Sequence, residues 1–239
     1  MAKHKINIHG AIIPNDYKFY YDFFEMDSTC PRDVASVLDS MTDGDDVDIY
    51  INSPGGSIDA GSEIYTLLRQ KSQTNPVNIF ITGEACSAAS VIACASHCSM
   101  SPTSLMMVHC VSTGIHGNHN DMEHVAEVLR TADNALCTAY MAKAGMTRTE
   151  ALEMMENETW LTAEQAKERG LVDEIIFEDA TEEAMPMVAS SGLFQLPTME
   201  QMERVRAMMV KPDNNKENRL KEAKRLARSK RMEERYEIH

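Results

Sequence analysis

The sequence lacks any long apolar run. Its N-terminal segment, MAKHKINIHG, has no apolar signal core, and no stretch approaches the ~18 consecutive apolar residues that span a bilayer. The six cysteines form no CxxC pair, and Cys94 and Cys98 are followed by no second ligand pair at zinc spacing. We therefore expect a soluble, cytoplasmic and reduced protein without a metal site.

Basic residues are also scarce. The chain has 23 Lys and Arg against 37 Asp and Glu, a net charge of −14, yet residues 203–239 carry 12 basic and 7 acidic residues. An acidic body argues against binding of nucleic acid by the body. The basic tail leaves three partners open, namely nucleic acid, an acidic protein or the body of the same chain.

Strand-like and helix-like stretches alternate up to about residue 178. This alternation predicts an α/β fold with repeated right-handed βαβ crossovers and a largely parallel sheet. Residues 17–26 are aromatic and fit neither pattern clearly. We expect strands at 5–13, 47–51, 77–81, 104–109 and 171–177; helices at 31–41, 57–70, 87–97, 120–144, 148–156 and 162–170; and helix-prone tail segments at 199–209 and 219–237.

Ser87 stands at the turn from a predicted strand to a predicted helix, among small residues. A serine in such a turn has room for a substrate and lies near helix N-terminal amides that stabilise negative charge. Serine is also a favoured helix cap, so Ser87 alone does not distinguish a nucleophile from a cap. Cys86, its neighbour, is a rival nucleophile.

Three other segments carry chemistry. The paired glycines Gly55 and Gly56 follow a strand, and their N–H groups can face a carbonyl oxygen as an oxyanion hole requires, although the string also suits an ordinary turn. His109 ends a strand and is either a general base or a structural histidine. Glu158 lies between two predicted helices, where its carboxylate either orients an imidazole or is simply solvated.

Four strings together resemble a known family. They are INSPGG with the helix after it, TGEACSAAS, MMVH and ETWLTAEQAKERGLVDEI. In order and spacing, over about residues 5–178, they are similar to the proteolytic subunit of the Clp protease (ClpP), and more closely to the ClpP-like head maturation proteases of tailed phages and prophages. The resemblance implies a serine endopeptidase that hydrolyses polypeptides through an acyl-enzyme and needs no cofactor.

The resemblance also implies an architecture. Residues 1–178 would form a ClpP/crotonase-like peptidase domain of repeated β-β-α and βαβ units with a protruding helical handle. Beyond the resemblance, the charged composition of residues 179–239 itself predicts an extension that is partly helical or disordered. Copies would associate into a homo-oligomeric ring, and the substrate could be capsid or scaffold protein. The family's axial pore loop, which helps to engage an unfoldase ATPase, is largely absent from the N-terminus, which leaves that partner open.

Roles follow position by position from the same resemblance. Ser87 matches the nucleophile, His109 the general base, and Glu158 the third, acidic residue, with Gly56 and the N–H of Ala88 matching the oxyanion hole and Gly55 beside it. The classical subunit has aspartate where this chain has Glu158, so Asn157 or a simple dyad is the alternative.

Three rival functions stay open at this point. One is an acyl-CoA enzyme of the crotonase type, which uses paired amides without a Ser/His pair. A second is a Ser/Lys peptidase of the signal-peptide-peptidase class, against which the shortage of lysine between Lys71 and Lys143 argues. The third is a catalytically silent ring or scaffold subunit that binds capsid protein.

Overall fold

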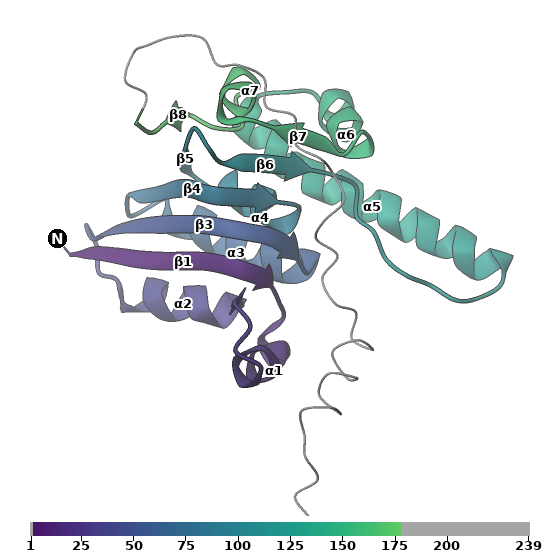
Figure 1. Cartoon of the computed structure of the whole chain (residues 1–239), viewed down its shortest axis with the longest axis horizontal. Coiled ribbons are helices and arrows are strands. Elements are labelled where there is room, and N and C mark those ends of the chain that lie inside the picture. Colours follow the sequence, from purple (N-terminus) through teal and green to yellow (C-terminus); the bar gives the residue numbers. More distant parts are fainter. Residues whose placement is uncertain (1, 178–239) are drawn as a thin grey trace, which may run out of the picture. The chain divides into compact units, whose positions relative to one another are not determined.

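The computed structural model describes residues 2–177, which are built around an eight-stranded, mainly parallel sheet (Figure 1). The strands run in the order β2-β1-β3-β4-β5-β8, while β6 pairs with both β4 and β7. The strands are β1 (Lys3–Ile12), β2 (Ser28–Thr29), β3 (Asp46–Gly56), β4 (Val77–Cys86), β5 (His97–Met100), β6 (Leu105–Val108), β7 (Thr159–Leu161) and β8 (Glu174–Ile175).

Alternating β-branched residues determine the register of the central strands. Ile49 of β3 pairs with Ile79 of β4, and both side chains are completely buried. Their neighbours Tyr50 and Phe80 point to the opposite face, where the two rings stack with centroids 5.2 Å apart. A slip of one residue would exchange the two faces and expose the isoleucines, so the pattern specifies a single register.

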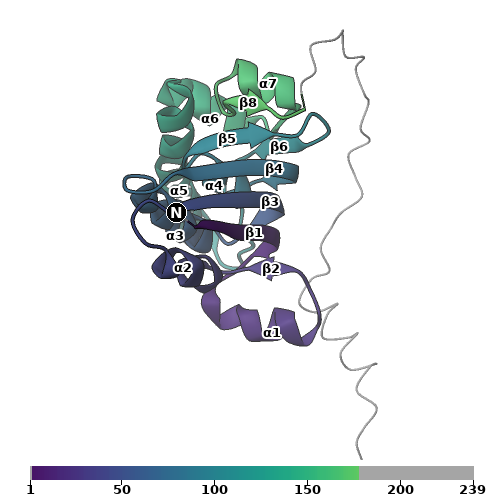
Figure 2. The same ribbon diagram turned by 90° about the vertical axis from the view of Figure 1, so that its left-hand side faces the viewer.

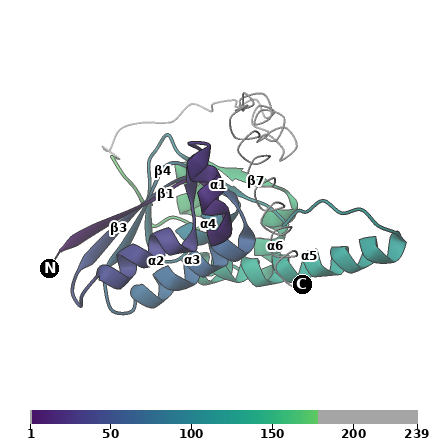
Figure 3. The same ribbon diagram turned by 90° about the horizontal axis from the view of Figure 1, so that it is seen from below.

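Helices cover one face of this sheet (Figures 2 and 3). α2 (Pro31–Ser40), α3 (Ile58–Lys71) and α4 (Ala88–Ala93) each connect one parallel strand to the next. This arrangement confirms the predicted α/β fold. Because the strands are parallel, the segments that follow β3, β4 and β6 emerge at the same edge of the sheet, where open α/β sheets bind their ligands.

The helices after β6 form a second part of the same unit. Asn118 caps α5 at its start, and Gly145, with φ +68°, ends it. The first half of α5 projects beyond the sheet, as expected for a handle, while its second half packs against the core through Cys137 and Tyr140 (Figures 1 and 3). The elements are α5 (His119–Ala144), α6 (Arg148–Glu156) and α7 (Ala163–Glu168).

Several expected boundaries are wrong. The helix expected at 87–97 stops at Ala93, and His97–Met100 is a strand, because a run of small apolar residues has no period that separates buried helix from buried strand. The strand expected at 171–177 shortens to β8. The unassigned aromatic stretch forms two short helices, η1 (Asn15–Tyr17) and α1 (Lys18–Phe23).

The C-terminal expectations, including the helices at 199–209 and 219–237 and the extension from residue 179, lie outside the described residues. Between residues 2 and 177, no helix has both the length and the apolar character needed to cross a membrane.

Candidate active site

Ser87 occupies a strained turn between β4 and α4. Its φ of +55° and ψ of −124° form a combination that non-glycine residues rarely adopt. The Ser87 N–H donates to the carbonyl of Met107 at 2.9 Å, and the Ser87 carbonyl accepts from the Ser90 hydroxyl at 2.6 Å. Strain of this kind persists only where the surroundings enforce it, and it concentrates at functional sites. The turn therefore holds the Ser87 hydroxyl in one place.

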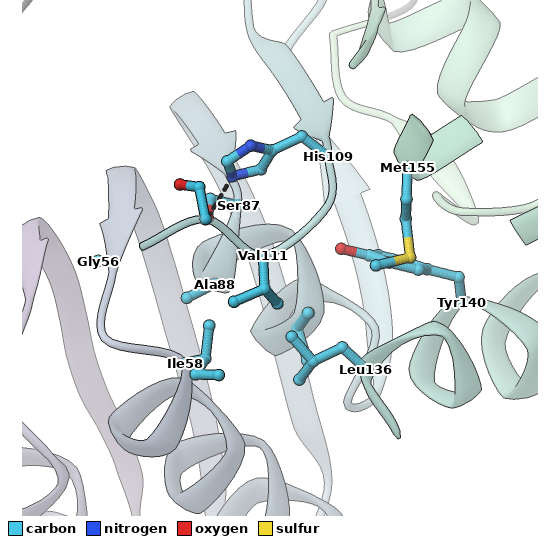
Figure 4. Close-up of a pocket in the computed structure, with 11 residues that line it drawn as sticks. Gly56, Ile58, Ser87, Ala88, His109, Val111, Leu136, Tyr140 and Met155 are labelled. Carbon is cyan, nitrogen blue, oxygen red and sulfur yellow. Dashed lines mark hydrogen bonds between the residues drawn. The ribbon is translucent and has the colours of Figure 1, made fainter. Parts of the chain in front are cut away.

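The imidazole of His109 meets this hydroxyl. Nε2 of His109 lies 2.8 Å from Oγ of Ser87 (Figure 4). The parallel pairing of β4 with β6 explains the meeting, because Cys86 is in register with Met107. Ser87 and His109 thus follow the ends of two neighbouring strands. A serine hydroxyl within hydrogen-bond reach of an imidazole is the arrangement that activates a nucleophile.

The backbone after His109 is anchored from two sides. The N–H of Cys110 donates to the carbonyl of Met155 at 3.0 Å, and the N–H of Val111 donates to the carboxylate of Asp133 at 2.7 Å. Asp133 lies on α5 and is only 8% exposed. The imidazole is therefore carried on a segment that α5 and α6 both hold.

Gly55 lies directly against the Ser87 turn. A Cβ on Gly55 would stand 2.6 Å from the Cβ of Ser87 and from the carbonyl oxygen of Cys86, and the backbone has φ +94°. The N–H of Gly55 donates to the Ser53 hydroxyl at 3.1 Å, and that hydroxyl donates to the carbonyl of Gly10 at 2.6 Å. Only glycine fits this position, since any side chain would displace the Ser87 turn.

The N–H of Gly56 is not directed at β1, and the N–H of Ala88 is not used within α4. In the parallel ladder with β1 the N–H of Ser57, not that of Gly56, donates to Ile12 at 2.8 Å, because alternate N–H groups face the neighbouring strand. The N–H of Ala88 belongs to the first residue of α4 and has no partner within that helix. These are the two donors that the resemblance assigns to an oxyanion hole.

Glu158 stands next to His109 in the strand register, but its carboxylate has another partner. The last pair between antiparallel β6 and β7 joins Val108 to Thr159, so Glu158 is the next residue opposite His109. The exposed Glu158 carboxylate accepts from the indole N–H of Trp160 at 3.4 Å, and its backbone has φ +44°. No hydrogen bond within the described chain joins it to the imidazole.

Asn157, the alternative third residue, is also engaged elsewhere. Its side-chain amide donates to the carbonyl of Glu153 at 2.8 Å, at the end of α6. Within residues 2–177, the His109 ring hydrogen-bonds to Ser87 and to neither Glu158 nor Asn157.

The rival reactive groups have different surroundings. Burial, together with the nearby Glu84 carboxylate, raises the pKa of the Cys86 thiol to about 12, so this thiol stays protonated at neutral pH. Lys143, at the end of the lysine-poor stretch, donates to the carbonyl of Ser96 and to the carboxylate of Asp173, so its ammonium group does not serve Ser87 as a Ser/Lys pair would require. In the part of the chain that the structure describes, no cluster of three His, Cys, Asp or Glu side chains could bind a metal ion.

A small cleft of about 60 Å³, open to solvent, lies beside the Ser87–His109 pair (Figure 4). Polar and apolar atoms contribute almost equally to its surface, and its volume is well below the ~300 Å³ at which small-ligand pockets begin. It leaves room for no more than part of one side chain of a bound peptide. The apolar and aromatic lining residues are Ile58, Val91, Val111, Leu136, Tyr140 and Met155.

Ser53, Ser90 and Tyr140 were not expected from the sequence, although all three contact the site through buried hydroxyl groups. Ser53 stands inside the INSPGG string, beside the glycines. Ser90 interrupts an apolar run, and a buried hydroxyl requires a partner. The place of Ser53 inside the INSPGG string and the hydroxyl of Ser90 within an apolar run are the sequence signals that could have identified these two residues.

Comparison with known proteins agrees with this geometry. Residues 28–179 match the family model described as Clp protease. This chain belongs to the Clp protease family. It is 35% identical over 146 residues to the ATP-dependent Clp protease proteolytic subunit 1 of Chlamydia abortus, covering 59% of this chain and 74% of that protein. The corresponding subunit of Bacteroides fragilis is 35% identical over 142 residues, covering 58% and 68%.

A solved structure supports the fold of this family member. A mutant of ClpP1 from Listeria monocytogenes superposes with a TM-score of 0.57 at 21% identity, covering 72% of this chain and 91% of that one. The chain is a serine peptidase of the ClpP type, and the crotonase-type and silent-scaffold readings are not favoured.

Proposed function

We propose that this Clp-family peptidase hydrolyses internal peptide bonds of polypeptides with Ser87 as nucleophile and His109 as general base. The observation that carries the proposal is the 2.8 Å contact between Ser87 Oγ and His109 Nε2. That contact lies beside the N–H groups of Gly56 and Ala88 and a small cleft, which supports a nucleophile, a base, an oxyanion site and a side-chain subsite in one place.

The reaction then follows from these groups. His109 Nε2 takes the hydroxyl proton as Ser87 Oγ attacks the peptide carbonyl carbon. The carbonyl oxygen becomes an oxyanion that accepts from the N–H groups of Gly56 and Ala88, each worth about 3 kcal/mol in such sites. The C–N bond breaks as His109 returns the proton to the leaving amine. Water, deprotonated by His109, hydrolyses the ester and restores the Ser87 hydroxyl.

Glu158 is proposed as the third catalytic residue, with Asn157 and a Ser87–His109 dyad as the alternatives. The register supports Glu158, because the pairing of Val108 with Thr159 brings it opposite His109. A rotation of its side chain away from Trp160 would be needed. The exposure of this turn leaves room for that rotation.

The natural substrate is proposed to be capsid or scaffold protein of a tailed phage or prophage. The support is the similarity of the Glu158-Thr159-Trp160 string to phage-type members of the family. We further propose that copies of the chain form a homo-oligomeric ring in the cytoplasm.

The test is hydrolysis of an unfolded, fluorescently labelled polypeptide by purified wild-type protein and by Ser87→Ala, with mass spectrometry of the new termini. We expect wild-type cleavage at internal bonds that follow apolar residues, and no cleavage by a folded Ser87→Ala protein. Full cleavage by that variant would overturn the assignment. Co-expression with a phage capsid protein tests the finer proposal, which fails if the capsid protein stays intact while the model polypeptide is cut.

A further inference from the structure

Beneath Ser87 lies a pair of buried hydroxyl groups that the proposed mechanism does not use. The hydroxyl of Tyr140, on α5, is 2.8 Å from the hydroxyl of Ser90, on α4. Both side chains are buried, at 2% and 0% exposure. The Ser90 hydroxyl also donates to the carbonyl of Ser87 at 2.6 Å. A polar link therefore runs from α5 through α4 to the backbone of the nucleophile.

The direction of this link follows from its donors. A serine hydroxyl has one proton, and Ser90 donates it to the Ser87 carbonyl, so Ser90 must accept from Tyr140. Burial raises the pKa of the Tyr140 hydroxyl above its ordinary value, which keeps that donor protonated. Two donations in series strengthen each other inside a protein.

The Ser87 carbonyl shares a peptide plane with the N–H of Ala88. In a trans peptide the C=O and the N–H point in opposite directions, and none of the described peptide bonds is cis. Holding the carbonyl of Ser87 against Ser90 therefore turns the N–H of Ala88 the other way. The N–H groups of Ser90 and Val91 donate to the same carbonyl at 3.0 and 3.4 Å, so the Ser90 hydroxyl, at 2.6 Å, is the shortest of three donors that hold this plane against the strained φ of Ser87, +55°.

We infer that Tyr140 and Ser90 are positioning residues that hold the Ala88 N–H toward the oxyanion, so that α5 helps to set the geometry of the oxyanion hole. This rests on the proposed roles of Ser87 and Ala88. The ring of Tyr140 also lines the cleft, where Figure 4 shows it reaching in beside Met155. The Tyr140 hydroxyl thus acts on the reacting carbonyl through Ser90, while the Tyr140 ring contacts the side chain of a bound peptide.

The test compares wild type, Tyr140→Phe, Ser90→Ala and the double variant on one peptide substrate. We expect kcat to fall about fivefold in Tyr140→Phe and about tenfold in Ser90→Ala, with KM unchanged, because the lost hydrogen bonds act on the transition state. A peptide aldehyde, whose hemiacetal oxygen occupies the oxyanion hole, should lose affinity by matching factors. The double variant should be no worse than Ser90→Ala, because Tyr140 acts through Ser90.

Tyr65→Phe is the matched control, since it removes a half-buried tyrosine hydroxyl on α3 and should leave kcat within twofold. The inference is overturned if folded Tyr140→Phe and Ser90→Ala keep wild-type kcat, if only KM changes, or if their effects are additive. Tyr140→Phe keeps the ring, so it decides the matter even where Ser90→Ala unfolds. Loss of activity in Ser87→Ala, together with wild-type kcat in both hydroxyl variants, would remove this inference alone.

Discussion

Four described non-glycine residues have positive φ, and the two of them that belong to the candidate site, Ser87 and Glu158, stand in turns that are held very differently. The Ser87 turn, at φ +55°, is fixed by buried hydrogen bonds to Met107 and Ser90 and has Gly55 packed against it. The Glu158 turn, at φ +44°, is exposed, and its carboxylate has a 3.4 Å bond to Trp160. The proposed nucleophile and the proposed oxyanion donors are thus preorganised by the core, while the Glu158 carboxylate is held only by a surface contact.

The comparison predicts that chemistry at the Ser87 turn dominates the rate. His109→Ala removes the base that contacts Ser87 at 2.8 Å, and we expect kcat to fall on the order of 10⁴-fold or more while the thermal midpoint changes little. Steady-state hydrolysis of one fluorogenic peptide measures kcat, and thermal unfolding of the same samples measures the midpoint. A fall below tenfold in folded protein would mean that another base serves Ser87.

A glycine series sharpens the comparison by separating crowding from backbone strain. Gly55→Ala places a Cβ 2.6 Å from Ser87 in a backbone with φ +94°, so we expect kcat to fall on the order of 10²-fold through displacement of the nucleophile and the oxyanion donors. Peptide hydrolysis and thermal unfolding are measured on the same samples.

Two matched controls accompany that variant. Gly145→Ala meets no atom within 4 Å but has φ +68°, so it should lose about 1 kcal/mol of stability and keep its kcat. Gly114→Ala meets no atom within 4 Å and has no positive φ, so it should change neither the stability nor kcat. Equal activity loss in Gly55→Ala and Gly145→Ala would show that general destabilisation, not the site, explains the result.

Glu158 tests the other side of the comparison. Glu158→Gln removes the charge but keeps the shape, and we expect kcat to fall about tenfold, the effect of one charge-assisted hydrogen bond that forms during the reaction. Trp160→Phe frees the carboxylate from its indole partner and should retain at least wild-type kcat. A loss of kcat in Glu158→Gln as large as that in His109→Ala would show that the exposed Glu158 turn contributes as much to catalysis as the buried Ser87 turn, which contradicts the comparison. No loss at all would indicate a dyad.

The smallest effect is expected at Cys86, beside the nucleophile. Its thiol has a pKa raised to about 12 by burial and by Glu84, so the reactive thiolate forms only as the pH approaches that value. At pH 7.5 fewer than about one molecule in 10⁴ would carry the thiolate. Cys86→Ala should keep kcat within twofold, and iodoacetamide at pH 7.5 should not inhibit the wild type through Cys86. Inactivation that maps to Cys86 would contradict this.

The sheet and the meeting of Ser87 with His109 could be foreseen because local signals and topology agree. Ile49 and Ile79 mark buried strands by their alternation, and parallel strands bring the ends of β4 and β6 together. The extent of α4 could not be foreseen, because small apolar residues such as Ala93 and Ala95 suit helix, strand and turn alike. β5 was missed for the same reason.

The supporting contacts of the site lie beyond sequence reasoning. Tyr140 reaches Ser90 across 50 residues, and Asp133 reaches Val111 across 22, so neither contact leaves a local pattern. The direction of the Glu158 carboxylate depends on the rotamer of an exposed side chain, which spacing does not specify. Sequence resemblance identified which residues could act, while the coordinates show which of them touch.

The most direct test of the central claim is covalent capture of the nucleophile. Wild-type protein is treated with a fluorophosphonate, weighed intact by mass spectrometry and then digested to locate the adduct. We expect one adduct per chain, located on Ser87, much slower labelling of His109→Ala, and none on Ser87→Ala. An unlabelled wild type, or an adduct that persists in Ser87→Ala, would contradict the account.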